Sequence, residues 1–282
     1  MGAVDPAPLA ALRSEHVAER VGLPLPELRA LAADPAPHYR PAYSKTKRDG
    51  FGRIKLKNGR PERRTIHPPG DDLKAAQQAL LSVLREHAPP LPCVYDGPGR
   101  GAVRGAKRHR GRPFHLATDL RDFFPSVGTK RLRHALRDLG AASDLARLVS
   151  ALGTLHGRLP QGAPTSGDLA GLAFRQADLD LLALCREHRL VYTRYADDLT
   201  VSGARDFKPL VPRLLDVVRE HGFRVRHDKT GYKRGPVEVT GVVVRQNVLR
   251  APATLVARAD DPTTSDATRA GLLAYRDQVR HA

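Results

Sequence analysis

The segment Thr193-Arg-Tyr-Ala-Asp-Asp-Leu-Thr-Val-Ser-Gly203 places two adjacent carboxylates between two short runs of strand-forming residues. β-Branched and aromatic side chains favour strands, so we expect a tight hairpin with Asp197 and Asp198 at its tip. Carboxylates held at a sheet edge can bind a hard divalent cation through oxygen. Asp is also common in solvated turns, so this segment alone leaves both interpretations open.

A third carboxylate follows an apolar run earlier in the chain. Phe114-His-Leu-Ala-Thr-Asp119 is typical of a buried strand that ends at Asp119. Three carboxylates about 6 Å apart repel one another by roughly 3 kcal/mol per pair at an effective dielectric near 20, which folding alone gives no reason to accept. Two Mg²⁺ ions about 4 Å apart remove this repulsion and are what in-line phosphoryl transfer uses. We therefore interpret Asp119, Asp197 and Asp198 as metal ligands and Asp122 as structural.

The charge of the chain indicates a polyanionic partner. Its 47 Lys and Arg exceed its 30 Asp and Glu, a formal net charge of +17. Lys and Arg docked on phosphates release condensed counterions, so nucleic acid is the leading partner. Hydrophobic residues make up 41% of the chain, which is enough for a core and excludes wholesale disorder.

The cysteine content and the lengths of apolar runs indicate the cellular compartment of the protein. Cys93 and Cys185 can supply neither a disulfide framework nor a Cys-rich zinc site. No run of about 18 apolar residues is present, and the N-terminus lacks a signal-peptide pattern. We expect a protein of a reducing cytosol with no membrane partner.

Periodicity, caps and turn residues predict a mixture of helices and strands, which is typical of an α+β fold. Helices are expected over 5–33, as one or two segments, and over 71–87, 129–140, 143–156, 166–188, 207–221 and 263–281. Strands are expected over 114–119, 190–195, 199–202 and 223–227, with hairpins over 51–66 and 237–249. The first hairpin turns at Asn58-Gly59 and has basic arms, and Thr165 with Asp168 is expected to form a capping box.

A stiff loop, Leu159-Pro-Gln-Gly-Ala-Pro-Thr-Ser166, precedes the long predicted helix. Gly162 lets the backbone approach a ligand, and Gln161 offers an amide to a base or sugar edge. Alone, this segment also fits a loop that only leads into a helix.

In this order, the segments resemble the reverse transcriptases, and more closely the retron-type reverse transcriptases of bacteria. Asp119 with Phe124-Pro-Ser126 is similar to the first catalytic motif, and Pro160–Ser166 to the template and nucleotide loop. Tyr195-Ala-Asp-Asp198 is similar to the polymerase signature. The resemblance runs from about Tyr39 to Arg250 and includes a lysine motif, Lys229-Thr230, and a primer-grip strand, Val239-Thr-Gly-Val-Val-Val244.

The resemblance implies a right-hand polymerase fold with fingers, a palm with an antiparallel sheet, and a reduced helical thumb. The implied boundaries are an N-terminal helical segment over 1–38, fingers over 39–115, a palm over 116–245 with fingers-like helices within 129–165, and a short thumb over 246–282.

The resemblance also implies roles for single residues. Catalysis and metal binding fall to Asp119, Asp197 and Asp198, with Leu120 as a further metal ligand. Nucleotide binding falls to Arg64, Phe124, Gln161 and Lys229, and the primer grip contains Thr240 and Gly241. Phe124 occupies the position of a steric gate against a ribose 2′-OH, and core packing is its alternative.

Two basic segments are candidate RNA contacts. The Gly- and Arg-rich segment 100–112 contributes Arg104, Lys107, Arg108 and His109, and the last helix contributes Arg269, Arg276 and Arg280. Solvated surface is the alternative for both segments.

The sequence therefore predicts an RNA-directed DNA polymerase that extends a primer 3′-OH with dNTPs, using two Mg²⁺ ions, or Mn²⁺ in their place. By resemblance, template and primer would be a structured noncoding RNA, and the product an RNA–DNA hybrid. The resemblance also implies a role in antiphage defence in the bacterial cytoplasm, with a toxin or effector protein as a further partner.

Two alternatives stay open at this point. Gly105-Ala-Lys-Arg-His109 lacks the Asn of the retron pattern, which favours another bacterial reverse transcriptase of the defence-associated or diversity-generating kind. A catalytically idle RNA-binding scaffold is the second alternative, although a pure binder has no use for clustered carboxylates that face a polyanion.

Overall fold

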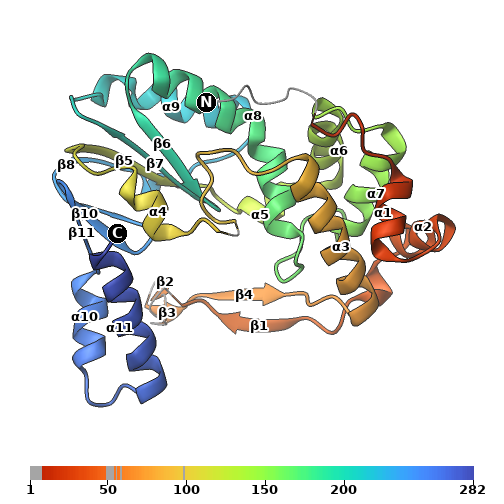
Figure 1. The fold of residues 1–282 in the computed structure, drawn as a ribbon, viewed down its shortest axis with the longest axis horizontal. Coiled ribbons are helices and arrows are strands. Elements are labelled where there is room, and N and C mark those ends of the chain that lie inside the picture. The colour runs from red at the N-terminus through yellow and green to blue at the C-terminus, as the bar shows by residue number, and fades with distance from the viewer. Residues whose placement is uncertain (1–7, 49–53, 55, 58, 98) are drawn as a thin grey trace. The chain divides into compact units, whose positions relative to one another are not determined.

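The computed structural model describes all of the chain except residues 1–7, 49–53, 55, 58 and 98 (Figure 1). The chain divides into two compact units. Unit 1 contains Met1–Lys47, Leu56–Pro90 and Asp122–Arg175, and unit 2 contains Arg48–Lys55, Leu91–Arg121 and Gln176–Ala282. Each unit is thus assembled from separate segments of the chain. The predicted domain boundaries at 38, 115 and 245 stay predictions.

Unit 1 is mainly helical. Its principal helices are α1 (Ser14–Val21), α2 (Leu25–Ala33), α3 (Asp71–His87), α6 (Thr129–Asp138) and α7 (Ser143–Gly153), with the short α5 (Phe123–Ser126) and the first part of α8 (Ser166–Glu187). The apolar stripe of α3 packs against α1 and α7, and α6 packs against α7. Gln77 in the stripe donates to the carbonyl of Leu152 at 2.8 Å, which satisfies part of a buried amide.

A two-stranded ribbon completes unit 1. β1 (Tyr43–Thr46) pairs antiparallel with β4 (Arg63–Ile66), and the short β2 (Leu56–Lys57) pairs with β3 (Arg60–Pro61). The predicted hairpin over 51–66 is confirmed at its inner end, where β2 and β3 pair across positions 58 and 59. It was wrong for Arg63–Ile66, because β4 takes its partner from upstream of the hairpin. Asn58 lies outside the described residues.

The main sheet of unit 2 is antiparallel and has the order β6-β7-β5-β8. Its strands are β5 (Phe114–Asp119), β6 (Val191–Tyr195), β7 (Asp198–Gly203) and β8 (Gly231–Arg234). A small apolar cavity is lined by side chains of β5, β6, β7, α8 and α9 (Val211–Glu220), so these two helices cover one face of the sheet. The other face carries α4 (Ala102–Lys107) and the residues after it.

The C-terminal part of unit 2 has a second small core. β9 (Val237–Val239), β10 (Val242–Arg245) and β11 (Val248–Arg250) form a sheet whose valines pack with α4 and with α11 (Asp266–Arg280). α10 (Ala253–Asp260) lies beside α11 as a helical pair (Figure 1). The mixed helices and antiparallel sheets confirm the predicted α+β class.

Three local predictions were wrong. Residues 223–227 form no strand and contribute one isolated bridge, Leu120 to Val225. β8, α4 and α10 arise where no element was expected. The capping box is absent because Asp168 makes a bidentate ion pair with Arg85 at 2.8 and 3.0 Å, a stronger contact than a neutral cap. The buried Thr165 hydroxyl has no hydrogen-bond partner in the described chain.

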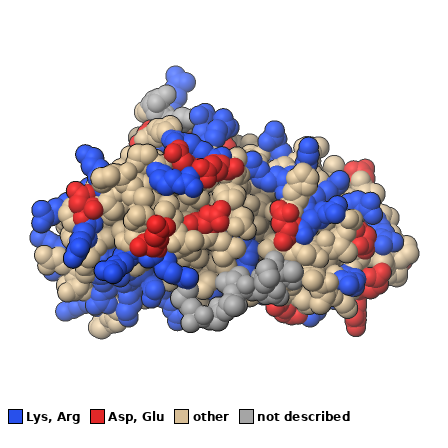
Figure 2. All heavy atoms as spheres, turned by 90° about the horizontal axis from the view of Figure 1, so that it is seen from above, with Lys and Arg blue, Asp and Glu red and all other residues tan. Residues whose placement is uncertain are grey.

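Two surface properties bear on partners. Lys and Arg side chains spread over the face drawn in Figure 2, whereas Asp and Glu form small scattered groups. No helix in the described part of the chain is long and apolar enough to cross a membrane.

Candidate active site

The register of β5 and β7 brings two of the predicted carboxylates opposite each other. Asp119 ends β5 and Asp198 begins β7, and the two residues are direct cross-strand partners. The amide of Leu120 donates to the carbonyl of Asp197 at 2.8 Å, which ties the hairpin tip to the chain after β5. Asp119 is 4% exposed, and the Asp198 side chain faces solvent. Strand pairing thus brings together residues that are almost 80 positions apart, as the sequence analysis predicted.

Lys229 of the predicted lysine motif contacts the same carboxylate. Its ammonium forms an ion pair with Asp119 Oδ2. The backbone supports this contact, because the amide of Arg226 donates to the carbonyl of Asp119 at 2.8 Å. The Thr118 and Thr230 hydroxyls, one from β5 and one from the residue after Lys229, are hydrogen-bonded at 2.7 Å. Asp119 therefore already has a cationic partner at its carboxylate.

At this arrangement the protein would supply only some of the ligands of a divalent ion. Among the described residues, no three His, Cys, Asp or Glu side chains converge as a ready-made metal cage. Mg²⁺ commonly uses one or two carboxylates and takes its other ligands from water and substrate phosphates, so facing Asp119 and Asp198 suit it. The Leu120 side chain is buried, which leaves only its backbone carbonyl for the metal role predicted for this residue.

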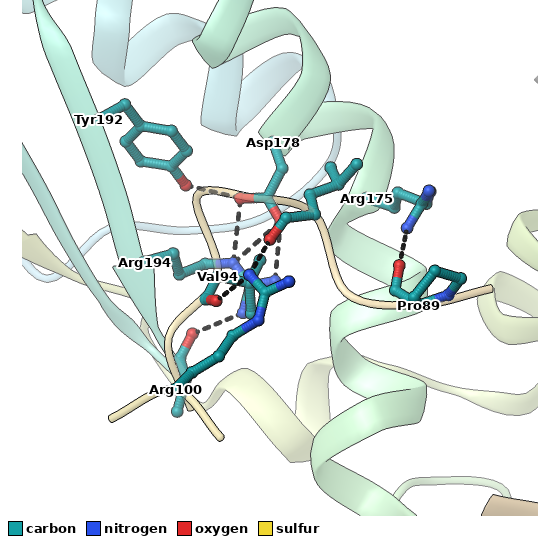
Figure 3. A network of polar contacts seen from close by, with 9 residues as sticks. Pro89, Val94, Arg100, Arg175, Asp178, Tyr192 and Arg194 are labelled. Carbon is teal, nitrogen blue, oxygen red and sulfur yellow. Dashed lines mark hydrogen bonds and ion pairs between the residues drawn. The ribbon is translucent and has the colours of Figure 1, made fainter. Parts of the chain in front are cut away.

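A buried arginine, Arg194, contacts the backbone of the hairpin (Figure 3). Arg194 is 1% exposed on its side chain and donates from Nε and Nη2 to Asp178 of α8, at 3.0 and 2.7 Å. Its Nη1 donates to the carbonyl of Ala196 at 3.1 Å. Ala196 has a φ of 51°, a left-handed conformation that a non-glycine residue seldom adopts. The guanidinium thus links α8 to the strained residue that precedes Asp197.

The charge of this arginine is compensated within the same network. Burial lowers the pKa of Arg194, but the charge and hydrogen bonds of Asp178, together with Tyr192 and Asp96, raise it above its ordinary value. Tyr192 donates its hydroxyl to the same carboxylate at 2.7 Å. No role was predicted for Arg194, although a charged residue within a strand of β-branched and aromatic residues was a signal, because Arg is seldom fully buried without a partner.

The edge of β6 is covered by the segment before α4. The amide of Arg194 donates to the carbonyl of Cys93, and the amide of Tyr95 donates to the carbonyl of Arg194, both at 2.8 Å. Arg100 holds this segment by donating to the carbonyls of Leu91 and Val94, at 2.6 and 2.7 Å (Figure 3). β6 therefore carries no free sheet edge along these residues.

The other face of the sheet carries His109, which does not lie where the sequence analysis placed it. The expected RNA-contacting side chain is fully buried, and its Nδ1 and Nε2 are hydrogen-bonded to Ser202 and Thr193, each at 2.7 Å. Burial lowers the pKa of His109 to about 3, so the ring is neutral. Neither ring nitrogen is left for RNA, whereas Lys107 and Arg108 are exposed.

The remaining predicted RNA contacts differ in their surroundings. Arg104 is exposed and donates to the carbonyl of Gly99. On α11, Arg269 and Arg276 have acidic neighbours at 3.5 and 3.3 Å, and Arg280 is exposed.

Thr240 and Gly241 of the predicted primer grip form the turn between β9 and β10, with φ values of 46° and 82°. Their roles stay predictions.

Unit 1 contains a pocket of about 490 Å³ that brings together two predicted nucleotide-binding residues, Arg64 and Gln161. The amide of His67 donates to the carbonyl of Gln161 at 2.7 Å, so the loop lies directly against the end of β4. Gly162 has a φ of 114°, and a Cβ there would lie 2.7 Å from Ile66 Cγ2. Only glycine allows this approach.

The pocket also has residues that the sequence analysis did not find. Lys47 and Arg158 line it, as does Asp122, which was expected to be structural. Lys47 lies in the basic stretch before β4, but nothing in the sequence indicated that it would share a pocket with Gln161. Phe124 is half-buried and stacks at a tilt on the buried Phe123, with 5.6 Å between ring centroids. Its role as a gate stays a prediction.

An antiparallel sheet with facing carboxylates at its hairpin, and a lysine on one of them, is the arrangement expected of the polymerase class. The family model described as reverse transcriptase (RNA-dependent DNA polymerase) matches residues 55–244. The chain belongs to this family. Reverse transcriptases generally use divalent metal ions, which agrees with the carboxylates at the hairpin.

Curated relatives agree with the predicted retron type, which is confirmed. The chain is 34% identical to the retron Mx162 reverse transcriptase of Myxococcus xanthus over 87% of this chain and 56% of that protein. It is 36% identical to the retron Mx65 reverse transcriptase of the same organism, over 75% and 57%. The retron Ec86 reverse transcriptase of Escherichia coli is 31% identical over 65% and 59%. The chain thus spans little more than half the length of these relatives.

Solved structures, together with the family model, confirm the predicted right-hand polymerase fold. Apo telomerase from Candida tropicalis matches with a TM-score of 0.52 and 11% identity, over 88% of this chain and 55% of that chain. Telomerase from Candida albicans in complex with a TWJ fragment of telomeric RNA matches with a TM-score of 0.50 and 13% identity, over 80% and 49%.

Proposed function

We propose that this chain is an RNA-directed DNA polymerase of retron type that copies a structured noncoding RNA into DNA. The observation that carries the proposal is the cross-strand pair Asp119 and Asp198, with Lys229 on the Asp119 carboxylate. Acidic side chains at one turn of a strongly basic chain are expected where divalent ions meet a polyanionic substrate.

The metal role falls to Asp119, Asp197 and Asp198, which would hold two Mg²⁺ ions, or Mn²⁺ in their place. The ions would lower the pKa of the primer 3′-OH and stabilise the pyrophosphate that leaves. Lys229 forms an ion pair with Asp119 in the absence of such ions and would contact an incoming phosphate when they bind. Arg194 and Asp178 hold the hairpin backbone and take no part in the chemistry.

The nucleotide would bind in the pocket of unit 1. Arg64 offers a planar guanidinium, which suits bidentate contact with phosphate oxygens. Gln161 Oε1 has no hydrogen-bond partner among the described residues, and in this proposal its amide binds a sugar or base. Phe124 would exclude a 2′-OH, and Thr240 with Gly241 would support the primer terminus.

Similarity to retron enzymes supports the choice of partners. These are a noncoding RNA as template and primer, dNTPs, and an RNA–DNA hybrid product, with a toxin or effector protein as a further partner. The same similarity supports a cytoplasmic role in antiphage defence. Because the chain spans little more than half of these relatives, all of these partners belong to the proposal.

The proposal is tested by DNA synthesis together with sequencing of nucleic acid that copurifies with the protein. We expect extension of a DNA primer annealed to RNA in the presence of dNTPs and Mg²⁺, and an RNA–DNA hybrid with a covalent junction in the copurified material. RNA without any DNA, together with no extension, would assign the chain to the idle scaffold instead.

One observation favours another bacterial reverse transcriptase of the defence-associated or diversity-generating kind. A Cβ at Gly105 would lie 3.2 Å from the Tyr95 ring, so the Asn of the retron pattern would need this ring to shift. DNA that copurifies without a covalent RNA junction would select this second candidate.

A further inference from the structure

Positive charge in unit 1 is concentrated on one helix. α6 carries four Lys and Arg and a single Asp in ten residues. α1, α2, α3 and α7 of the same unit each carry at least as many Asp and Glu as Lys and Arg. The net charge of the chain therefore does not explain α6, because its neighbours do not share the excess.

Three of the four Lys and Arg residues of α6 lie on one face, and Arg131 does not. Lys130, Arg133, His134 and Arg137 are all exposed, and we call them the basic strip. Their spacings of three, four and seven residues place them along one side of a helix. The buried residues of α6 are Leu132 and Leu136, which lie on a different side.

Folding gives no reason for the strip. Like charges three or four residues apart destabilise a helix, and Lys130 lies in the first turn, where the helix dipole favours acidic side chains. Among the residues that the structure describes, no acidic side chain forms an ion pair with Lys130, Arg133 or Arg137. Arg133 donates from Nε to the neutral Ser150 hydroxyl at 3.1 Å, so its charge is left uncompensated.

The composition of the strip indicates the partner. Protein interfaces usually have an apolar core, and none of the exposed large hydrophobic residues of the described chain lies on α6. Contact with a phosphate backbone needs only cations. From Lys130 to Arg137 the strip spans about 10 Å, which is long enough for its cations to contact neighbouring phosphates of one strand.

We propose that the basic strip binds the phosphate backbone of RNA at a surface separate from the nucleotide pocket. None of the four strip residues lines that pocket. The inference rests on the proposed function in one respect, that the polyanion is RNA. Because backbone contacts carry no sequence information, the strip would hold a structured RNA without reading its bases.

The test compares two double variants with equal charge. Lys130→Gln with Arg137→Gln removes one Lys and one Arg from the strip, and Arg29→Gln with Lys74→Gln removes one of each from exposed positions of α2 and α3. The probe is a labelled RNA hairpin with a single-stranded tail, and its affinity is measured over a series of salt concentrations. We expect the slope of log K against log salt to fall by about 1.4 to 1.8 for the strip variant, since each lost phosphate contact contributes about 0.7 to 0.9.

The control variant should keep the wild-type slope. Equal changes in both variants, or no change in either, would show that the strip is ordinary surface. Polyglutamate serves as a second probe that represents an acidic protein segment. If the strip variant loses affinity for polyglutamate but keeps wild-type affinity for the RNA hairpin, the strip binds a protein partner and the proposal is overturned. Thermal unfolding checks that each variant folds. The strip variant should be at least as stable as wild type, because repulsion between like charges on α6 has been reduced.

DNA synthesis separates this proposal from the proposed function. At saturating primer and template, the strip variant should extend at the wild-type rate. If the chain makes no DNA under any condition but its RNA binding still depends on the strip, the polymerase proposal fails and the strip proposal stands.

Discussion

Arg194 Nη1 donates to the carbonyl of Ala196 at 3.1 Å, while the opposite edge of the same guanidinium contacts Asp178. One fully buried side chain therefore connects the backbone of the carboxylate hairpin to α8. The guanidinium can serve both partners because its donors are arranged in a rigid plane, a geometry that lysine lacks.

Arg194→Lys should impair synthesis through the hairpin. We expect a lower kcat and a higher Mg²⁺ concentration for half-maximal activity, with primer–template affinity unchanged, because charge is kept but the Ala196 contact is lost. The control is Arg213→Lys, which changes an exposed ion pair with Glu220. A folded Arg194→Lys protein with wild-type kcat and Mg²⁺ requirement would show that the contact does not position the hairpin.

Asp119→Asn and Asp197→Asn should each abolish primer extension, because each removes an anionic ligand of the proposed ions. RNA affinity, measured by filter binding, should persist or increase, since a negative charge leaves a basic surface. Asp216→Asn, an exposed carboxylate of α9, is the control and should leave extension unchanged. Near wild-type extension by Asp197→Asn is incompatible with the metal assignment.

Phe124→Ala should admit ribonucleotides. If Phe124 packs beneath the nucleotide sugar, opening this space should reduce dNTP over rNTP preference by about 10- to 200-fold, which corresponds to roughly 1–3 kcal/mol. The measurement is kcat/KM for dCTP and CTP on the same template. If Phe124→Ala is destabilised but its preference for dNTP over rNTP is unchanged, Phe124 serves core packing through its contact with Phe123.

Gly162→Ala should raise the KM for dNTP. The added Cβ would collide with Ile66 Cγ2, and the positive φ of Gly162 disfavours alanine, so we expect about 1–3 kcal/mol of strain that pushes the Gln161 loop away from β4. Gly167→Ala is the matched control, because a Cβ there meets nothing within 4 Å. Equal KM values for the two variants would contradict this role for the loop.

The folded state should lose stability in mild acid through its buried histidines. Burial lowers the pKa of His109 to about 3 and that of His115 to about 4, whereas both are near 6.5 in the unfolded chain. The unfolded state therefore binds more protons below about pH 6.5, and each histidine removes up to about 1.4 kcal/mol of stability per pH unit as the pH falls toward its folded pKa.

Urea unfolding at a series of pH values measures this effect. His109→Gln should reduce the pH dependence between about pH 6 and 4 by one proton relative to wild type. His188→Gln, an exposed position, is the control. An unchanged slope in His109→Gln would mean that His109 is not buried in its neutral form.

Several elements followed from local pattern alone. The helix over 71–87 was predicted with both ends correct, because its leucines recur at helical spacing and Pro89-Pro90 follows it. The strand that ends at Asp119 was predicted because an apolar run of that length and composition is buried on both faces. Asp119 and Asp198 lie at strand ends and Asp197 lies in the turn, as the residues around each one predicted, whereas their metal role stays a prediction.

Tertiary structure decided what depends on partners distant in sequence. β4 pairs with β1 and not across its own turn, and His109 is buried because Thr193 and Ser202, more than 80 residues away, offer hydroxyls to its ring. A histidine in a basic segment has the same local pattern whether it faces RNA or a sheet. Arg194 is likewise buried because α8 brings Asp178 to it, and a buried charge is tolerated only where such a partner is supplied by the packed fold.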